Sequence, residues 1–364
     1  MKTIYHVGGW CRNYGDMAIQ HTMMTMLNSC SPEPLRFIPI DLKMNKPITS
    51  EMVDIINERG DMLIVGGGGL IMAGDGFDTA SGWQFNIKPD DLGKLNVPLV
   101  IYGAGVNMFP GETLSENTRQ HLLMTNEVAT IFTTRDKGSM GALREMGLTD
   151  LGVIPDPAMF IDSVDVNLPG LDKDGPLVGL CLAGDRLDKR FNSIDMDEWL
   201  EVLCHQLGNF LDFFGGVDSG SVVHIPHVSK FDMCFDEQLR SFLGDRFYNL
   251  PEHLPWMYPE EIACVPALAG VYQQMTVAVG MRGHSNIIPF GQLTPVLCLG
   301  EHDKNKFFAD EVGCYSIGND LGGLTSAMVE TVGFQHRQNQ VNVFNDCSNA
   351  AAIINTQILQ ILFE

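Results

Sequence analysis

The chain has 364 residues, which is more than one hydrophobic core usually serves, so two domains are expected. Hydrophobic residues make up 45% and charged residues 19% of the sequence, a balance that excludes a disordered or fibrous protein. The formal net charge of -22 at pH 7 disfavours nucleic acid and anionic membranes as partners, so any bound anion needs a local basic site.

Targeting signals and cysteine pairs are both missing from the pattern. Nine cysteines are spread singly without a C-x-x-C pair, which argues against a zinc site and a disulfide framework and fits a reducing compartment. The first residues, 1–7, read as a strand and not as a secretory signal. The longest apolar runs, such as 62–73, are far shorter than the roughly 20 residues of a membrane helix. We therefore expect a cytoplasmic protein with no transmembrane segment.

The first half of the chain alternates short apolar runs with longer amphipathic patterns, which is typical of βαβ units and a parallel sheet. The expected strands are 5–7, 62–65, 99–102 and 131–133, and the expected helices are 17–27 and 115–127. Glycines end three of these strands, at 8–9, 66–69 and 103–105. Ligands collect at the carboxyl ends of such strands, where glycine lets the backbone approach them closely.

A second series of alternating elements follows the segment 162–176, which is rich in Asp, Gly and Pro and is expected to be a linker. Its expected strands are 176–184, 221–225, 276–280 and 295–299, and its expected helices are 195–214, 260–270 and, beyond the polar segment 336–346, 347–363. The fold class is therefore α/β, with two Rossmann-like domains that face a cleft as in GT-B proteins. The predicted domains are 1–168 and 176–330, followed by a C-terminal segment, 331–364, whose helix crosses back to the first domain.

The opening motif, 8–16, lies directly before the first expected helix and reads G-G-W-C-R-N-Y-G-D. Asp16 is a natural N-cap, and the helix N-terminus offers N–H groups to an anion or a sugar hydroxyl. Capping and direct substrate contact both stay open for Asp16. The dinucleotide pattern G-x-G-x-x-G is absent, so no nicotinamide cofactor is expected.

The four glycines 66–69 are costly in chain entropy, which favours a close passage of backbone or ligand. Tight packing between strand and helix is the structural alternative. No Gly-Lys-Ser/Thr follows, so this is not a Walker loop.

Arg135 stands where a strand ends and a helix begins, and Gly147 is expected just past the end of that helix. A guanidinium at this place can hold a carboxylate or a phosphate. An ion pair with Asp136 or Asp156 is the alternative.

The segment 277–304 brings three cationic or protonatable side chains to one end of a sheet. A strand ends before Arg282 and His284, and a second strand leads to Lys304. Only 23 Lys and Arg occur in the whole chain, so this clustering predicts a site for a small multivalent anion.

Taken in order, these motifs resemble the polysaccharide pyruvyl transferase family. The resemblance spans residues 5 to about 315 and includes a G-G…N-x-G-D start, a glycine run, a Gly-Ala-Gly segment, an R-D-x-x-S element, a P-D-P-A element and a late R-x-H followed by Lys. The matching residues are Gly8, Gly9, Asn13, Gly15, Asp16, Gly66, Gly67, Gly68, Gly69, Gly103, Gly105, Arg135, Asp136, Ser139, Asp156, Arg282, His284 and Lys304.

The resemblance implies a transferase with phosphoenolpyruvate as donor, held in the cleft by Arg135, Arg282 and His284, with the second domain as the donor side. Lys304 is a third expected cationic contact. Asn13, Gly67, Gly68 and Ser139 are expected substrate-binding residues, and the first domain is expected to bind the acceptor. Gly283 and the pair 301–302 depart from the family pattern, which puts the choice of acceptor in question.

The expected reaction forms a pyruvate ketal on a sugar or glycan, with His284 as general acid and Asp16 as base or hydroxyl ligand. Neither a metal nor a cofactor is expected, and a homo-oligomer is compatible with the sequence. Two alternatives stay open: a nucleotide-sugar-dependent glycosyltransferase of the same fold, and a non-enzymatic protein that binds a sugar or nucleotide. The D-x-D sequence 195–197 is better explained by the start of a helix than by a metal site.

Overall fold

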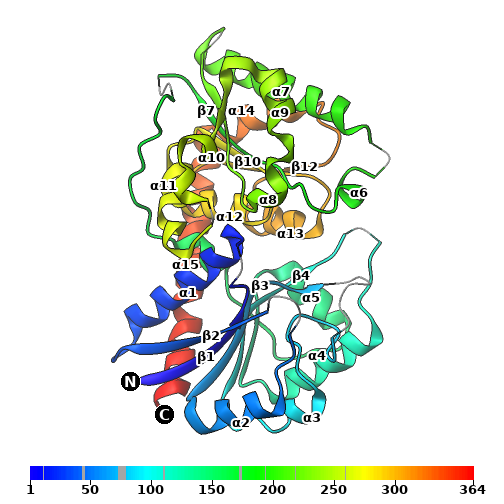
Figure 1. Ribbon diagram of the computed structural model, residues 1–364, viewed down its shortest axis with the longest axis vertical. Coiled ribbons are helices and arrows are strands. Elements are labelled where there is room, and N and C mark those ends of the chain that lie inside the picture. Colours follow the sequence, from blue (N-terminus) through cyan, green and yellow to red (C-terminus); the bar gives the residue numbers. More distant parts are fainter. Residues whose placement is uncertain are drawn as a thin grey trace. The chain divides into compact units, whose positions relative to one another are not determined.

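The computed structural model describes residues 1–10, 12–42, 46–72, 79–109, 111–171, 174–192, 194–217, 219–258 and 260–364. Four residues that entered the sequence interpretation, Cys11, Ala73, Asp172 and Lys173, lie outside these ranges. The described chain forms two compact units (Figure 1). Unit 1 comprises Met1–Cys11, Asp16–Pro157 and Asp346–Glu364, and unit 2 comprises Arg12–Gly15 and Ala158–Asn345.

Unit 1 is built on a parallel six-stranded sheet in the order β2-β1-β3-β4-β5-β6. Its strands are β1 (Lys2–Gly8), β2 (Leu35–Asp41), β3 (Met62–Met72), β4 (Leu99–Asn107), β5 (Ile131–Thr134) and β6 (Gly152–Val153). Its helices are α1 (Tyr14–Cys30), α2 (Ser50–Arg59), α3 (Pro89–Leu92), α4 (Glu116–Val128) and α5 (Lys137–Glu145). The order and the parallel pairing confirm the predicted Rossmann-like arrangement.

Unit 2 repeats this plan with a second parallel sheet in the order β12-β11-β10-β7-β8-β9. Its strands are β7 (Leu177–Cys181), β8 (Ser221–His224), β9 (Phe247–Asn249), β10 (Val277–Gly280), β11 (Val296–Leu299) and β12 (Tyr315–Ile317). Its helices are α6 (Leu187–Arg190), α7 (Met196–Gly215), α8 (Ser229–Asp232), α9 (Asp236–Leu243), α10 (Leu250–His253), α11 (Val265–Gln273), α12 (His284–Gly291), α13 (Asp303–Val312), α14 (Leu324–Thr331) and the first part of α15 (Phe334–Phe363). The described part of the segment 162–176 contains neither helix nor strand.

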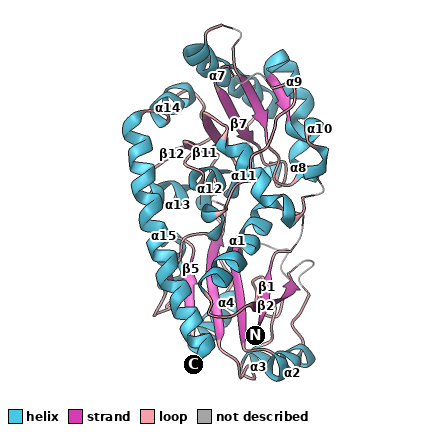
Figure 2. Cartoon of the chain, turned by 90° about the vertical axis from the view of Figure 1, so that its left-hand side faces the viewer, coloured by secondary structure: helices cyan, strands magenta, loops and turns pink. Residues whose placement is uncertain are grey.

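The long helix α15, shown along its length in Figure 2, has contacts in both units. Its Gln340 side-chain amide donates to the carbonyls of Phe290 and Thr294 in unit 2, at 3.0 and 2.9 Å. Its Asn355 accepts a 3.0 Å hydrogen bond from the Tyr102 hydroxyl in unit 1. The predicted return of the C-terminal helix to the first domain is therefore confirmed. The polar segment 336–346, expected to lie outside the helix, is helical because tertiary contacts and not apolarity hold it there.

Two further sequence expectations differ from the structure. Asp16 is not the N-cap of α1, because the helix already begins at Tyr14 and Asp16 lies in its first turn. The glycines 66–69 do not follow β3 but form its middle, and 103–105 lie within β4. Glycine inside a strand often marks a place where another backbone approaches closely, because no side chain is present there. Among the described helices, none is both long and apolar enough to cross a membrane.

Candidate functional site

In unit 2, Arg282 follows β10 and lies between two carboxylates. Its Nε and Nη2 atoms donate to the two oxygens of Asp232 at 2.8 and 2.5 Å, which is bidentate pairing of a guanidinium with a carboxylate. Its Nη2 also lies 2.7 Å from Oδ1 of Asp185. The side chain of Arg282 is 13% exposed, so most of it is removed from water. The predicted ligand-binding arginine thus already has two anionic partners in its own unit.

Asp232 joins the ends of three neighbouring strands. Besides Arg282, it accepts hydrogen bonds from the backbone N–H groups of Gly184 after β7, and of His227 and Val228 after β8, at 3.2, 3.0 and 2.9 Å. Its side chain is fully buried. A buried charge is tolerated only when it is paired and hydrogen-bonded, and Asp232 meets both conditions. It fixes the Arg282 guanidinium at the carboxyl edge of the sheet.

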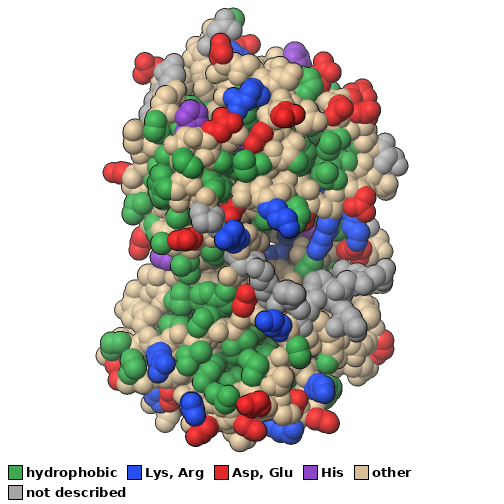
Figure 3. Space-filling model, in the orientation of Figure 1, with side chains coloured by type: hydrophobic (Ala, Val, Ile, Leu, Met, Phe, Trp, Pro, Cys, Tyr) green, Lys and Arg blue, Asp and Glu red, His purple; other side chains and the backbone are tan. Residues whose placement is uncertain are grey.

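Asp185 is more exposed and is surrounded by cations. Arg190 donates to its backbone carbonyl at 2.8 Å, and Nη2 of Arg190 lies 3.5 Å from its carboxylate. Burial opposes its ionisation, but the positive charges of Arg282, Arg190, Lys304 and Arg186 lower the pKa of the Asp185 carboxyl overall. Figure 3 shows Lys and Arg side chains gathered over this part of unit 2, near α6, α8 and α13. In a chain with net charge -22, this is a local positive site.

His284 begins α12 and packs against the start of α1. A Cβ atom on Gly15 would lie 2.1 Å from Nδ1 of His284, so only glycine leaves room for this imidazole. The Gly15 N–H donates to Oδ1 of Asn13 at 3.0 Å, and the Tyr14 N–H donates to the His227 carbonyl at 3.0 Å. Tyr14, which belongs to unit 2, is thereby attached to the segment that follows β8. Gly15, held by Asn13, leaves the space that His284 occupies, a role that the sequence did not reveal.

His227 is a buried histidine that the sequence interpretation missed. Its Nε2 lies 2.7 Å from the Tyr272 hydroxyl. Burial lowers the pKa of His227 well below the ordinary value, and the neighbouring His284 and Arg282 lower it further. It therefore stays neutral and contributes its backbone carbonyl to the attachment of Tyr14.

Lys304 lies over the residue that separates Arg282 and His284. A Cβ on Gly283 would stand 3.6 Å from both Cδ and Cε of Lys304, which is ordinary van der Waals contact. Lys304 belongs to the first turn of α13, whose N-cap is His302. Unit 2 thus brings together three of the predicted residues, Arg282, His284 and Lys304.

In unit 1, Asp16 lies beside the end of β1 and the middle of β3. A Cβ on Gly9 would stand 2.9 Å from Cγ of Asp16, and one on Gly68 would stand 3.8 Å from Oδ1 of Asp16. Asp16 and Gly68, both predicted site residues, are therefore close. For Gly67 the nearest atoms are the Tyr102 carbonyl, at 3.2 Å, and Ile19, at 3.3 Å, so strand and helix packing already accounts for that glycine.

Arg135 follows β5 and lies flat against β4. Its Nε donates to Oδ2 of Asp136 at 3.1 Å, which is the ion pair weighed from the sequence. A Cβ on Gly105 would stand 2.3 Å from this Nε, so glycine admits the guanidinium. Asp136 caps α5 by accepting from the Ser139 N–H, and the Ser139 hydroxyl accepts from the Val106 N–H at 2.9 Å. Ser139, predicted to bind substrate, thus has a structural hydrogen bond.

Several buried polar atoms of unit 1 have no hydrogen-bond partner within the protein. The Gln20 side chain is fully buried, its Oε1 and Nε2 both lack a partner, and it packs on Gly8. Oδ1 of Asn107, at the end of β4, and Nη2 of Arg135 are in the same condition. Native structures leave few such atoms without a reason, and a bound ligand is one. Gln20 and Asn107 were missed, although a polar residue four positions after Asp16 and one at a strand end were visible signals.

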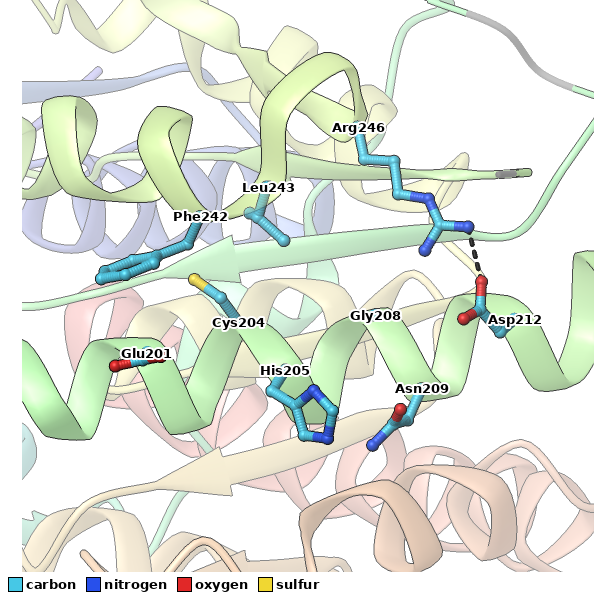
Figure 4. Close-up of a pocket in the computed structure, with 9 residues that line it drawn as sticks. All are labelled: Glu201, Cys204, His205, Gly208, Asn209, Asp212, Phe242, Leu243 and Arg246. Atoms are coloured by element: carbon cyan, nitrogen blue, oxygen red, sulfur yellow. Dashed lines mark hydrogen bonds and ion pairs between the residues drawn. The ribbon is translucent and has the colours of Figure 1, made fainter. Parts of the chain in front are cut away.

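A separate hollow of about 460 Å³ lies on unit 2 between α7 and the segment 242–246 (Figure 4). Gly208 lies midway along its α7 wall, and Arg246 forms a 2.5 Å ion pair with Asp212 at one end. It contains none of the predicted site residues.

At the start of α7, Asp195 accepts from the N–H groups of Asp197 and Glu198, which confirms the helix-start interpretation of the D-x-D sequence.

These two parallel sheets with their helices define a GT-B-like α/β protein, and known structures agree with this class. The UDP-GlcNAc 2-epimerase of Neisseria meningitidis bound to UDP-GlcNAc has a TM-score of 0.60 at 10% identity, with 100% of each chain covered. MnaA of S. aureus in complex with UDP has a TM-score of 0.59 at 15% identity, covering 93% of this chain and 91% of that one. HepE of Anabaena in complex with UDP and glucose has a TM-score of 0.54 at 10% identity, covering 100% and 99%. At these identities the likeness concerns the fold alone.

A comparison of the sequence with protein-family models identifies the family. The family model of polysaccharide pyruvyl transferase matches residues 13–303, and the chain belongs to this family. Among curated proteins no significant match is found.

Proposed function

We propose that the protein transfers the three-carbon group of phosphoenolpyruvate to two hydroxyls of a sugar and so forms a pyruvate ketal. The observation that carries this proposal is the cluster of Arg282, Lys304 and His284 at one sheet edge of an acidic protein. Phosphoenolpyruvate carries a carboxylate and a phosphate, and cationic donors bind both groups strongly. Membership of the pyruvyl transferase family supports this reaction class.

The proposed chemistry starts with a proton on the methylene carbon of the donor. His284 supplies it as general acid, because imidazole exchanges protons near neutral pH. A sugar hydroxyl attacks the cationic carbon, phosphate leaves, and a second hydroxyl closes the ketal. Of the two hydroxyl protons released, one restores His284 and the other leaves with phosphate. Asp16 orients an attacking hydroxyl or passes its proton on to phosphate, and no cofactor takes part.

For the acceptor we propose unit 1. The unpartnered buried atoms of Gln20 and Asn107 offer both donors and acceptors, as sugar hydroxyls require. Arg135 has an unpartnered Nη2 that is able to donate to an anionic group, so the contact with the donor expected from the resemblance is chemically possible. Strand packing explains Gly67, and the Ser139 hydroxyl is already in use, so these two have the weakest support among the predicted ligands.

The test is to incubate the protein with phosphoenolpyruvate and a panel of hexosides. Phosphate release, together with a sugar product heavier by phosphoenolpyruvate minus phosphoric acid, supports the proposal. Consumption of a nucleotide sugar with no reaction of phosphoenolpyruvate would establish the glycosyltransferase alternative instead.

Two variant pairs locate the chemistry. We expect His284→Ala to lower kcat by about 10²- to 10⁴-fold, while His205→Ala on the exposed face of α7 leaves it unchanged. Lys304→Met is expected to raise KM for phosphoenolpyruvate, whereas Lys306→Met, which breaks only a surface pair with Glu301, is not. Retention of most activity in His284→Ala would remove the general-acid assignment.

A further inference from the structure

Two carboxylates contact the same atom of Arg282, but their surroundings differ. Asp232 is fully buried and held by three backbone N–H groups. The Asp185 side chain is 27% exposed, and its carboxylate pairs with the side chains of Arg282 and Arg190. A ligand that arrives from solvent therefore meets Asp185 first. Of these two carboxylates, Asp185 is the one that a ligand can replace at Arg282.

The backbone around Asp185 has an uncommon conformation. Arg186, the next residue, adopts φ 53° and ψ 44°, a left-handed conformation that few residues other than glycine occupy. On the other side, a Cβ on Gly184 would stand 1.9 Å from the Phe231 carbonyl, so this backbone runs directly against α8. Such local conformations persist where the surrounding structure imposes them, and they cluster at ligand sites.

Asp185 lies in a positive electrostatic environment. Four cations act on it, namely Arg282, Arg190, Lys304 and Arg186, while Asp185 and Asp232 are the two carboxylates bound to Arg282. These positive charges favour a ligand with more than one negative charge. A ligand with a phosphate and a carboxylate is of this kind near neutral pH.

We propose that Asp185 occupies the anion site as a built-in competitor, and that an anionic group of the ligand displaces it from Arg282 and Arg190. Asp232 stays in place and keeps the guanidinium oriented during the exchange. Asp185 is thus a specificity-determining residue: a ligand with a single weak charge does not displace it, whereas a phosphate does. The inference rests on the proposed function only for the identity of the ligand, because the exchange concerns any phosphate-bearing anion.

The experiment compares Asp185→Asn with Asp188→Asn, an exposed residue in the first turn of α6 that undergoes the same change of charge. Binding of inorganic phosphate and of phosphoenolpyruvate is measured by calorimetry without acceptor. We expect Asp185→Asn to bind both anions about three- to tenfold more tightly than the wild type, and more tightly than Asp188→Asn. Equal binding by the two variants, weaker binding by Asp185→Asn, or no phosphate binding by any of the proteins would overturn the inference.

Asp185→Ala provides the same comparison if the asparagine variant does not fold. The proposed function is tested separately by turnover of phosphoenolpyruvate in the wild type. Tighter phosphate binding by Asp185→Asn in a protein that does not consume phosphoenolpyruvate would support the built-in competitor and reject the donor. Turnover without any gain in anion affinity would do the reverse.

Discussion

Replacing Asp232 by asparagine tests whether this residue holds the strand ends of unit 2 together. The change removes the charge that faces Arg282 and places an NH₂ group where oxygen now accepts from backbone N–H groups. The side chain is fully buried, so water cannot replace the lost interactions. Breaking a buried ion pair by changing one partner costs roughly 3 to 5 kcal/mol. For a unit of this size that corresponds to a fall of about 6 to 20 °C in Tm.

The assay is thermal unfolding followed by circular dichroism and calorimetry, with Asp245→Asn as matched control. Asp245 is exposed after α9, so the same chemical change there is expected to shift Tm by no more than about 1 °C. Asp232→Asn should also lower phosphate binding, because Arg282 loses its orientation. If Asp232→Asn has the same Tm as the control, Asp232 does not hold the strand ends together and the reasoning is refuted.

Three further changes address other contacts. Gly15→Ala should lower activity at least about tenfold, because the added methyl displaces His284. In the control Gly141→Ala the added methyl meets open space in α5, so activity should be kept and the free energy of unfolding should rise by up to about 1 kcal/mol. Equal activity of the two variants would contradict the positioning role of Gly15. Burial lowers the pKa of His6 to about 4, so between pH 6.5 and 4 this side chain binds a proton in the unfolded chain but not in the folded one. Unit 1 should thus lose about 3 kcal/mol between pH 6.5 and 4, a loss absent from His6→Asn and measurable by urea unfolding against pH. Tyr102→Phe removes the hydrogen bond to Asn355 and should cost about 1 to 3 kcal/mol in urea unfolding, whereas an unchanged midpoint would mean that this contact does not hold α15.

The sequence by itself determined the fold class and the order of its elements. Alternation of apolar runs and helical patterns predicts parallel strands because the periods of strand and helix differ, and β1, β4, β7 and β10 appear where expected. The helix α7 and its cap at Asp195 followed from local chemistry alone. The cluster of Arg282, His284 and Lys304 was also predictable, because strand ends of one parallel sheet share an edge.

Only the tertiary structure decided which groups contact one another across long stretches of chain. Nothing local links Arg282 to Asp232 or to Asp185, which lie 50 and 97 positions away, and neither carboxylate belongs to a recognisable motif. The glycines 66–69 predicted a close approach, but the neighbouring strand β4 and helix α1 proved to be what approaches. Hydrogen bonds and ion pairs depend on distances of a few tenths of an ångström, which side-chain packing sets and residue order does not. The local pattern thus located the basic residues, and the fold gave Arg282 a fixed carboxylate, Asp232, and an exposed one, Asp185.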